Sequence, residues 1–230
     1  APDEYVSRQG ADAVRVYLMF IGPWDQGGEW DDSGLAGISR WLNRVWTLVL
    51  SPAETTRQAE AQTGRASQVR ELRRMTHKTI RRVTEDVERF RFNTMVAAMM
   101  EYTNYLARLK ESGPVDEAGW REAMSSLMLL LAPSAPHIAE ELWKRTGNAY
   151  SIHNQRWPEW DAELAAEEEI TLVVQVNGKV RDRIQAPADV SEERAKELAL
   201  SSAKVQPYVV GRSVAKVVYV PGRLVSIVVR

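Results

Sequence analysis

Hydrophobic residues recur at helical spacing over roughly the first two thirds of the chain. Between residues 33 and 50 they alternate at steps of three and four, which places one set on a single helical face: Leu35, Ile38, Leu42, Val45 and Val49. Asp32 or Ser33 can cap the start of this helix, and Ser51-Pro52 ends it. A shorter helical pattern runs from Tyr5 to Ile21.

More helical patterns follow a polar, alanine-rich connector at residues 53–67. They predict helices over about 67–90, 92–109, 116–132 and 138–144. The segment 116–132 is apolar almost all round at its C-terminal end, which is typical of the buried central helix of a bundle. The methionines of these helices lie on core faces, which favours core filling over an adaptable binding groove: Met95, Met99, Met100, Met124 and Met128. This part of the chain is predicted to be an all-α bundle.

The pattern changes after Trp157-Pro158. An acidic, alanine-rich stretch ends at Glu169, and two β-rich runs follow on either side of Asn177-Gly178. An Asn-Gly pair between such runs is a strong hairpin signal, because both central residues of a type I′ turn need a positive φ. Ser191 can cap a helix that ends near residue 201, and two further strands, 214–220 and 224–229, surround a Pro-Gly turn. The order β-β-α-β-β predicts a second, smaller domain.

Composition narrows the class of protein. Hydrophobic residues make up 44% and charged residues 27% of the chain, as in ordinary globular domains. Thirty basic and thirty-one acidic residues nearly cancel, so any affinity for nucleic acid must come from local patches. The absence of cysteine excludes disulfide scaffolds, thiolate zinc sites and cysteine nucleophiles, and it suits the cytoplasm, where we expect the protein. The apolar runs are far shorter than the ~20 residues that cross a bilayer, and no signal peptide is present, so we expect no membrane partner.

Candidate catalytic chemistry is scarce. The sequence contains no nucleophile elbow, phosphate-cradling loop or His-Glu-x-x-His helix. His137 and Glu140 lie one helical turn apart and could ligate a metal, but no second pair accompanies them. A histidine that hydrogen-bonds locally at a helix start is therefore the favoured interpretation. The acidic stretch at 158–169 lacks a calcium-loop pattern and is better explained as a solvated linker. We expect no metal site and no cofactor in this chain.

One segment has a charge pattern unlike that of an ordinary solvent-exposed helix. Between Arg65 and Arg91 there are nine basic residues and only four acidic ones, three of which lie near the far end. Arg70, Arg74, His77 and Arg81 recur along one face of the predicted helix, opposite its apolar stripe, and Arg73, Lys78 and Arg82 flank them. Segregated basic stripes attract phosphate backbones. An ordinary charged surface remains the alternative.

The predicted small domain repeats this theme. From Ile170 onward there are ten basic and five acidic residues. Lys179, Arg181 and Arg183 alternate along one strand and should share a face, while Lys216 and Arg223 lie on or beside the last hairpin. Two basic elements on separate domains suggest a long nucleic acid that touches both.

Several motifs resemble a known enzyme family. The run from Leu131 to Trp143, Leu-Ala-Pro-Ser-Ala-Pro-His-Ile-Ala-Glu-Glu-Leu-Trp, resembles the helical anticodon-binding bundle of class I aminoacyl-tRNA synthetases for leucine, isoleucine, valine and methionine. Val174–Arg181 and Val218–Val225 are similar to the C-terminal domain of bacterial-type leucyl-tRNA synthetases. The similarity extends over other motifs along the chain: Gly10–Arg15, Glu29–Gly34, Arg40–Trp46 and Phe92–Thr94.

This resemblance implies a domain plan. Residues 1–32 would be a connector after an absent catalytic domain, 33–157 the anticodon-binding-type bundle, 158–169 an acidic linker, and 170–230 a small C-terminal tRNA-binding domain. The fold class is then a helical bundle followed by a small α/β domain. The chain opens on Ala1 rather than Met, and we expect it to be a C-terminal segment of a longer synthetase. The partners would be tRNA(Leu) and the rest of a monomeric synthetase chain.

The resemblance also implies what this segment lacks. The family's His-Ile-Gly-His and Lys-Met-Ser-Lys-Ser signatures are absent from the sequence, so no catalytic residue is assigned. The intact enzyme would activate leucine with ATP and magnesium and esterify it to tRNA, whereas this segment would hold the tRNA and be inactive alone. It would recognise tRNA by shape, in agreement with a basic stripe without interleaved aromatic residues. The alternative is a free-standing helical module that binds a protein or generic RNA. A Lys-Met-Ser-Lys-Ser loop encoded just upstream of Ala1 would decide between the two.

Overall fold

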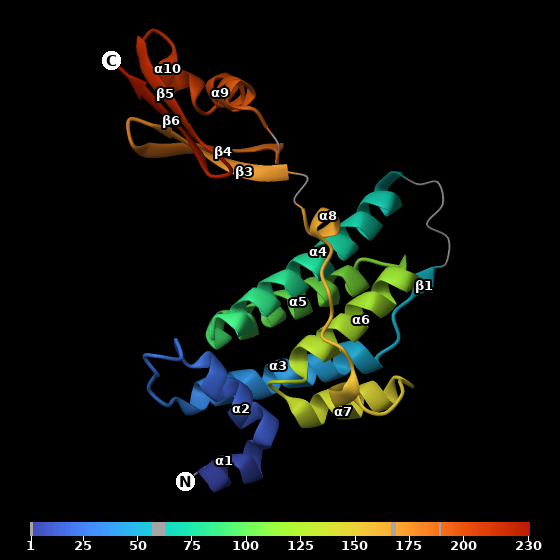
Figure 1. The fold of residues 1–230 in the computed structure, drawn as a ribbon. Coiled ribbons are helices and arrows are strands. Elements are labelled where there is room, and N and C mark those ends of the chain that lie inside the picture. Colours follow the sequence, from blue (N-terminus) through green and yellow to red (C-terminus); the bar gives the residue numbers. More distant parts are fainter. Residues whose placement is uncertain (1, 57–62, 167–168, 189) are drawn as a thin grey trace. The chain divides into compact units, whose positions relative to one another are not determined.

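The computed structural model describes residues 2–56, 63–166, 169–188 and 190–230 (Figure 1). The chain divides into two compact units, Ala1–Ala166 and Glu167–Arg230. The first is a helical bundle and the second a small sheet with helices on it. The predicted class of a helical domain followed by a small α/β domain is therefore confirmed at this level. Within the described ranges, no helix combines the length and apolar character that crossing a bilayer requires.

Two helices, rather than the single one predicted from Tyr5 to Ile21, begin the first unit. They are α1 (Pro2–Gln9) and α2 (Ala11–Phe20). Gly10 separates them with a φ of 84°, a left-handed conformation that glycine adopts without steric cost. The next helix, α3 (Asp32–Leu50), is capped by Asp31, whose side chain accepts hydrogen bonds from two backbone N–H groups. The predicted cap at Asp32 or Ser33 is wrong by one residue or two.

The remaining helices of the bundle follow the predicted periodicity closely. They are α4 (Thr63–Glu88), α5 (Phe92–Glu111), α6 (Glu117–Leu131) and α7 (Pro136–Arg145). A two-residue parallel ladder between β1 (Thr55–Thr56) and β2 (Val115–Asp116) is the small departure from an all-α unit. The predicted connector at 53–67 covers β1 and the start of α4, and its residues 57–62 lie outside the described part.

The C-terminal end of α6 is buried, as predicted. Leu127, Leu130 and Leu131 are at most 1% exposed. Four of the five methionines are also buried in the same core, and Met100 packs against it. One buried polar pair joins two helices: Trp41 Nε1 donates to Thr103 Oγ1 over 3.2 Å. Burial in this core therefore explains the helical spacing of the apolar residues and the positions of the methionines.

The segment after Trp157 does not leave the bundle. It forms the short helix α8 (Ala162–Ala165), which packs on α4 (Figure 1). Trp157 Nε1 donates to Thr84 Oγ1 over 2.8 Å, so the approach to α8 is also fixed on α4. The sequence predicted a solvated linker over residues 158–169, but the residues up to Ala166 pack on the bundle instead.

The second unit is a four-stranded sheet in the order β4-β3-β6-β5. Its strands are β3 (Glu169–Val176), β4 (Lys179–Pro187), β5 (Val214–Val220) and β6 (Leu224–Val229). Asn177 and Gly178 have φ of 48° and 78°, as the predicted hairpin turn requires. Two helices follow β4, namely α9 (Glu192–Ser201), capped by Ser191, and the four-residue α10 (Gln206–Val209). The order is thus β-β-α-α-β-β, one short helix more than expected.

Candidate nucleic-acid interface

Four arginines of α4 are paired with acids. Arg74 and Arg81 bind Glu71 and Glu85 of the same helix, at 2.6 and 2.9 Å. Acids of neighbouring helices reach the others: Arg73 lies 3.7 Å from Glu122 of α6, and Arg82 lies 2.6 Å from Glu101 of α5. Arg70 and Lys78 have partners as well. Basic residues are therefore segregated along the sequence of α4, but the fold places acidic residues of α4, α5 and α6 next to them.

These pairs reduce the net charge that the α4 stripe presents. The hydrogen bond from Arg81 holds the pKa of Glu85 below its ordinary value, so this carboxylate stays ionised near neutral pH. A phosphate that binds Arg81 must therefore compete with Glu85. Exposed pairs of this kind are weak, and such an exchange costs little. Contact of Arg70, Arg73, Arg74, Lys78, Arg81 and Arg82 with tRNA stays a prediction.

His77 does not belong to the exposed face on which the spacing placed it. It is 7% exposed. Its Nε2 lies 3.1 Å from Glu122 Oε1, and its Nδ1 accepts a hydrogen bond of 3.0 Å from the backbone N–H of Asp161. The ring therefore joins α4, α6 and the segment before α8. Sequence periodicity missed this role because both partners are distant in sequence.

Aromatic residues accompany the basic helix, contrary to expectation. The Arg81 guanidinium lies 5.1 Å from the ring centroid of Trp160. At the turn between α4 and α5, Phe92 contacts Phe90 and Trp24, with centroids 5.5 and 5.3 Å away. Phe90 and Trp24 are more than 60% exposed. The sequence marks the positions of these rings by a Gly-Pro-Trp turn and by a helix break at Phe90. Neither feature predicts that the rings are in contact.

The three basic residues of β4 do not share a face. A β-bulge at Arg181 shifts the register: Asp182 pairs with Val174, but Val180 pairs with the next residue of β3, Gln175. The shift moves Lys179 to the side opposite Arg183, because Lys179 then pairs with the buried Val176. The prediction of a common face, made from strict alternation, is wrong.

Each of the basic residues in the second unit consequently has its own environment. Arg181 lies 3.8 Å from the ring centroid of Tyr208 in α10, on the helix side. Arg183 is exposed on the other side, as is Lys216, which pairs with Val228. Arg223 is exposed in the turn between β5 and β6. Two of the five predicted contacts, Arg183 and Lys216, therefore lie on the same helix-free face.

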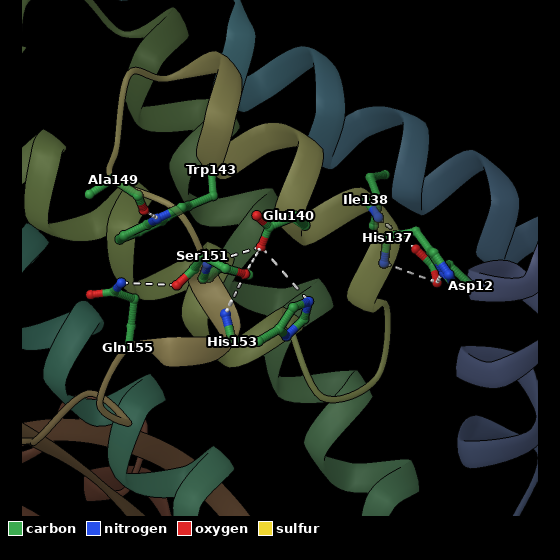
Figure 2. Close-up of polar contacts among 10 residues, drawn as sticks. Asp12, His137, Ile138, Glu140, Trp143, Ala149, Ser151, His153 and Gln155 are labelled. Carbon is green, nitrogen blue, oxygen red and sulfur yellow. Dashed lines mark hydrogen bonds and ion pairs between the residues drawn. The ribbon is translucent and has the colours of Figure 1, made fainter.

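The histidine and glutamate of the Leu131–Trp143 motif have structural partners (Figure 2). The carboxylate of Asp12, in α2, accepts hydrogen bonds from His137 Nδ1 and from the backbone N–H of Ile138, both over 2.7 Å. Glu140 accepts from Ser151 Oγ and from the backbone N–H of Ile152, in the 3₁₀ helix Ile152–Asn154. The predicted local hydrogen bond of His137 is thus a tertiary one. Among the described residues, no three potential ligands gather to hold a metal ion.

Figure 2 also shows how the first segment is fastened to the bundle. Asp12 caps the N-terminus of α7, where backbone N–H groups have no partner within the helix. Arg15, one turn further along α2, donates to the carbonyl oxygens of Pro133 and Ser134 over 2.9 and 3.3 Å. The Gly10–Arg15 motif therefore binds the proline-rich turn of the Leu131–Trp143 motif. Both motifs therefore contribute tertiary contacts that hold the bundle together.

A helical bundle with these motifs, followed by a small sheet rich in basic residues, indicates the class of tRNA-ligase domains. The chain belongs to the family of anticodon-binding domains of tRNA ligases, which matches residues 69–196. Within this family its relatives are leucine–tRNA ligases. It is 56% identical over 229 residues to the enzyme of Dehalococcoides mccartyi and 57% identical over 228 residues to that of Rubrobacter xylanophilus.

These comparisons cover 100% and 99% of this chain but only 27% of each relative, so the chain spans about a quarter of their length. A solved structure agrees in fold. The ternary LeuRS–tRNA–LeuAMS complex from Agrobacterium radiobacter K84 matches 100% of this chain and 30% of its own, with a TM-score of 0.82 and 32% identity.

Proposed function

We propose that this chain is the tRNA-binding C-terminal region of a leucine–tRNA ligase. The observation that carries the proposal is the similarity along its whole length to leucine–tRNA ligases, together with a fold shared with a LeuRS solved with tRNA. The chain would position tRNA(Leu), and the catalytic and editing sites would lie in the part of the ligase that it does not include.

The intact ligase would activate leucine with ATP and magnesium and then esterify it to tRNA(Leu) in the cytoplasm, as a monomer. The groups described above fit a supporting role. Asp12, Arg15 and Glu140 fasten helices together, and the arginines of α4 are paired with acids. None of these arrangements supplies a nucleophile with a base, so the chain's contribution would be to hold the tRNA.

Two measurements on the 230-residue chain test this proposal. The chain should bind a tRNA(Leu) transcript with a salt-dependent affinity, because contacts with phosphates release counterions. It should show no leucine-dependent exchange between ATP and pyrophosphate. Exchange activity in a clean preparation, or equal affinity for tRNA(Leu) and an unstructured RNA of the same length, would contradict the proposal. The latter result would favour the alternative of a generic RNA-binding module.

A further inference from the structure

The strand β6 continues beyond the strand that pairs with it. β3 and β6 run parallel and are paired as far as Val176 and Ile227. β3 then turns into the hairpin at Asn177 and Gly178, whereas β6 continues to Val229. The side chain of Val229 belongs to the core of the second unit and is 6% exposed. The backbone of Val229 therefore needs a partner on the side where β3 has already turned away.

The side-chain amide of Asn177 is this partner. The backbone N–H of Asn177 donates to the carbonyl oxygen of Ile227 over 2.9 Å, as the last step of the parallel ladder. Two residues further along β6, the N–H of Val229 donates to Asn177 Oδ1 over 3.0 Å. Asn177 Nδ2 in turn donates to the carbonyl oxygen of Val229 over 3.2 Å. The amide thus binds Val229 as the backbone of a longer β3 would, and we call these two hydrogen bonds the amide pair.

Asn177 is also the one asparagine of the sequence that precedes a glycine. Glycine has no Cβ to obstruct its backbone nitrogen, so the nitrogen of Gly178 can attack Cγ of the asparagine side chain. The nitrogen gives up its proton as the new N–Cγ bond forms, and the Cγ–Nδ2 bond breaks with release of ammonia. Water then opens the resulting succinimide ring at one of its two carbonyl groups. The product at position 177 is either aspartate or isoaspartate.

The amide pair opposes this reaction in the folded unit. Both polar atoms of the Asn177 side chain are held by another strand, so both hydrogen bonds must open before Cγ can turn to the nitrogen of Gly178. Access of water is not the obstacle, because both residues of the turn are exposed and the space around Gly178 is open. The rate of reaction should therefore follow the local opening of the end of β6.

Neither product can form the amide pair again. An aspartate carboxylate can still accept from the N–H of Val229, but it places a second oxygen against the Val229 carbonyl, which loses its donor. Isoaspartate adds a backbone atom to a two-residue turn whose φ values of 48° and 78° fit the type I′ geometry. Either product leaves part of the Val229 backbone on an unpaired edge of the sheet.

We propose that Asn177 is a modification site, and that its spontaneous deamidation releases the end of β6 from the sheet. The substrate is the Asn177–Gly178 peptide itself, and water is the co-reactant. The change runs in one direction, because the released ammonia takes the hydrogen-bond donor with it. This proposal concerns the stability of the second unit and does not depend on the proposed function.

The first test follows deamidation of the 230-residue chain at mildly alkaline pH. Peptide mass spectrometry quantifies the conversion at Asn177 and distinguishes aspartate from isoaspartate. The folded chain should react about tenfold or more slowly than the same chain in urea, because two hydrogen bonds must open first. Equal rates in buffer and in urea, or no conversion in either, would overturn the proposal.

Two shortened chains show whether Val229 provides the protection. A chain that ends at Val228 lacks both partners of the amide and should deamidate several-fold faster than the unaltered chain. A chain that ends at Val229 is the matched control, because it retains both partners, and it should react more slowly than the shorter chain. Thermal melting verifies that the second unit is folded in each. If the two shortened chains are folded and react equally fast, the amide pair does not protect Asn177.

The consequence of the reaction is tested with Asn177→Asp, which reproduces one product. Hydrogen exchange at the amide of Val229 should accelerate several-fold, and the second unit should melt at a lower temperature. Asn177→Gly is the control without a charge: glycine keeps the positive φ of the turn and removes the amide, so it should also accelerate the exchange. Exchange as slow as in the unaltered chain for both variants would show that the amide does not hold the end of β6.

Discussion

His77 accepts a hydrogen bond through Nδ1 from the backbone N–H of Asp161, across 3.0 Å and 84 residues of sequence. Because Nδ1 is the acceptor, the ring proton must be on Nε2, which donates to Glu122 at 3.1 Å. One buried histidine thereby holds α8 and its preceding segment on α4. The second unit begins directly after this segment. His77 is thus one of several contacts that hold residues 157–166 on α4, beside the hydrogen bond of Trp157 and the contact of Arg81 with Trp160.

The first prediction concerns this contact. His77→Ala should expose the segment around Asp161 and lower the stability of its attachment by about 1 kcal/mol, since the hydrogen bond to the Asp161 N–H is lost together with that to Glu122. Hydrogen exchange of the Asp161 amide, followed by mass spectrometry, should accelerate several-fold. His77→Asn is the matched control, because its side-chain oxygen can accept the same hydrogen bond. Equal exchange rates in the alanine variant and the unaltered chain would contradict this role.

The helices illustrate what sequence alone could predict. The apolar residues of α3 are local and periodic, and Ser51-Pro52 ends the helix, so its extent was predicted almost exactly from residues 33–50. Gly10 shows the limit of this approach. Apolar spacing continues across the residue, and only its backbone conformation, with φ of 84°, reveals the break between α1 and α2.

The candidate site was harder to predict for a physical reason. Arg181, as the extra residue of a bulge, reverses the side of Lys179 relative to Arg183, and strict alternation contains no sign of a bulge. The charges of α4 pose the same problem. Glu101 and Glu122 neutralise arginines of another helix, and only the packing of α4 against α5 and α6 brings them together. Periodicity predicts which face a residue occupies but not what faces it.

A second prediction follows from Asp182, which holds β4 to the turn after α9. A hydrogen bond from Ser202 Oγ, and then one from the backbone N–H of Arg183, lower the pKa of this carboxyl below its ordinary value. Folding therefore stabilises the ionised form. The resulting stabilisation is complete above the ordinary aspartate pKa and is lost as the pH falls through the lower, folded-state value.

NMR titration of the Asp182 carboxyl between pH 2 and 6 checks this. Its midpoint should lie below that of an ordinary aspartate in the unaltered chain and rise in Ser202→Ala. Lys204→Ala should raise it less, since the 3.3 Å contact from Lys204 is the smaller influence. An unchanged midpoint in Ser202→Ala would mean that the serine does not hold this carboxylate.

The third prediction concerns the arginines of α4. If Arg74 and Arg81 contact tRNA phosphates, Arg74→Ala/Arg81→Ala should weaken tRNA binding and make the salt slope shallower by about 0.7 to 0.9 for each lost contact. Loss of the exposed Arg81–Glu85 pair should change thermal stability little, because exposed ion pairs contribute about 0 to 1 kcal/mol. Loss of Arg74, whose side chain is 22% exposed, should lower it more. Glu85→Gln provides the opposite change: it releases Arg81 from its partner at 2.9 Å and should strengthen binding. If neither variant alters the salt slope, the stripe does not contact the RNA.

The last prediction separates the two units. Because residues 158–166 pack on α4, a truncation after Ala166 removes the second unit and leaves the bundle complete. This shortened chain should keep the melting temperature of the bundle but bind tRNA(Leu) more weakly than the full chain, since the exposed basic residues of the second unit, among them Arg183 and Lys216, are gone. A truncation after Trp157 is the matched control: it removes the partner of His77 and should lower the melting temperature as well. In an intact leucine–tRNA ligase, the truncation after the residue equivalent to Ala166 should impair transfer of leucine to tRNA and leave leucine activation nearly unchanged. If activation fell as far as transfer, the second unit would support the catalytic part of the ligase rather than hold the tRNA.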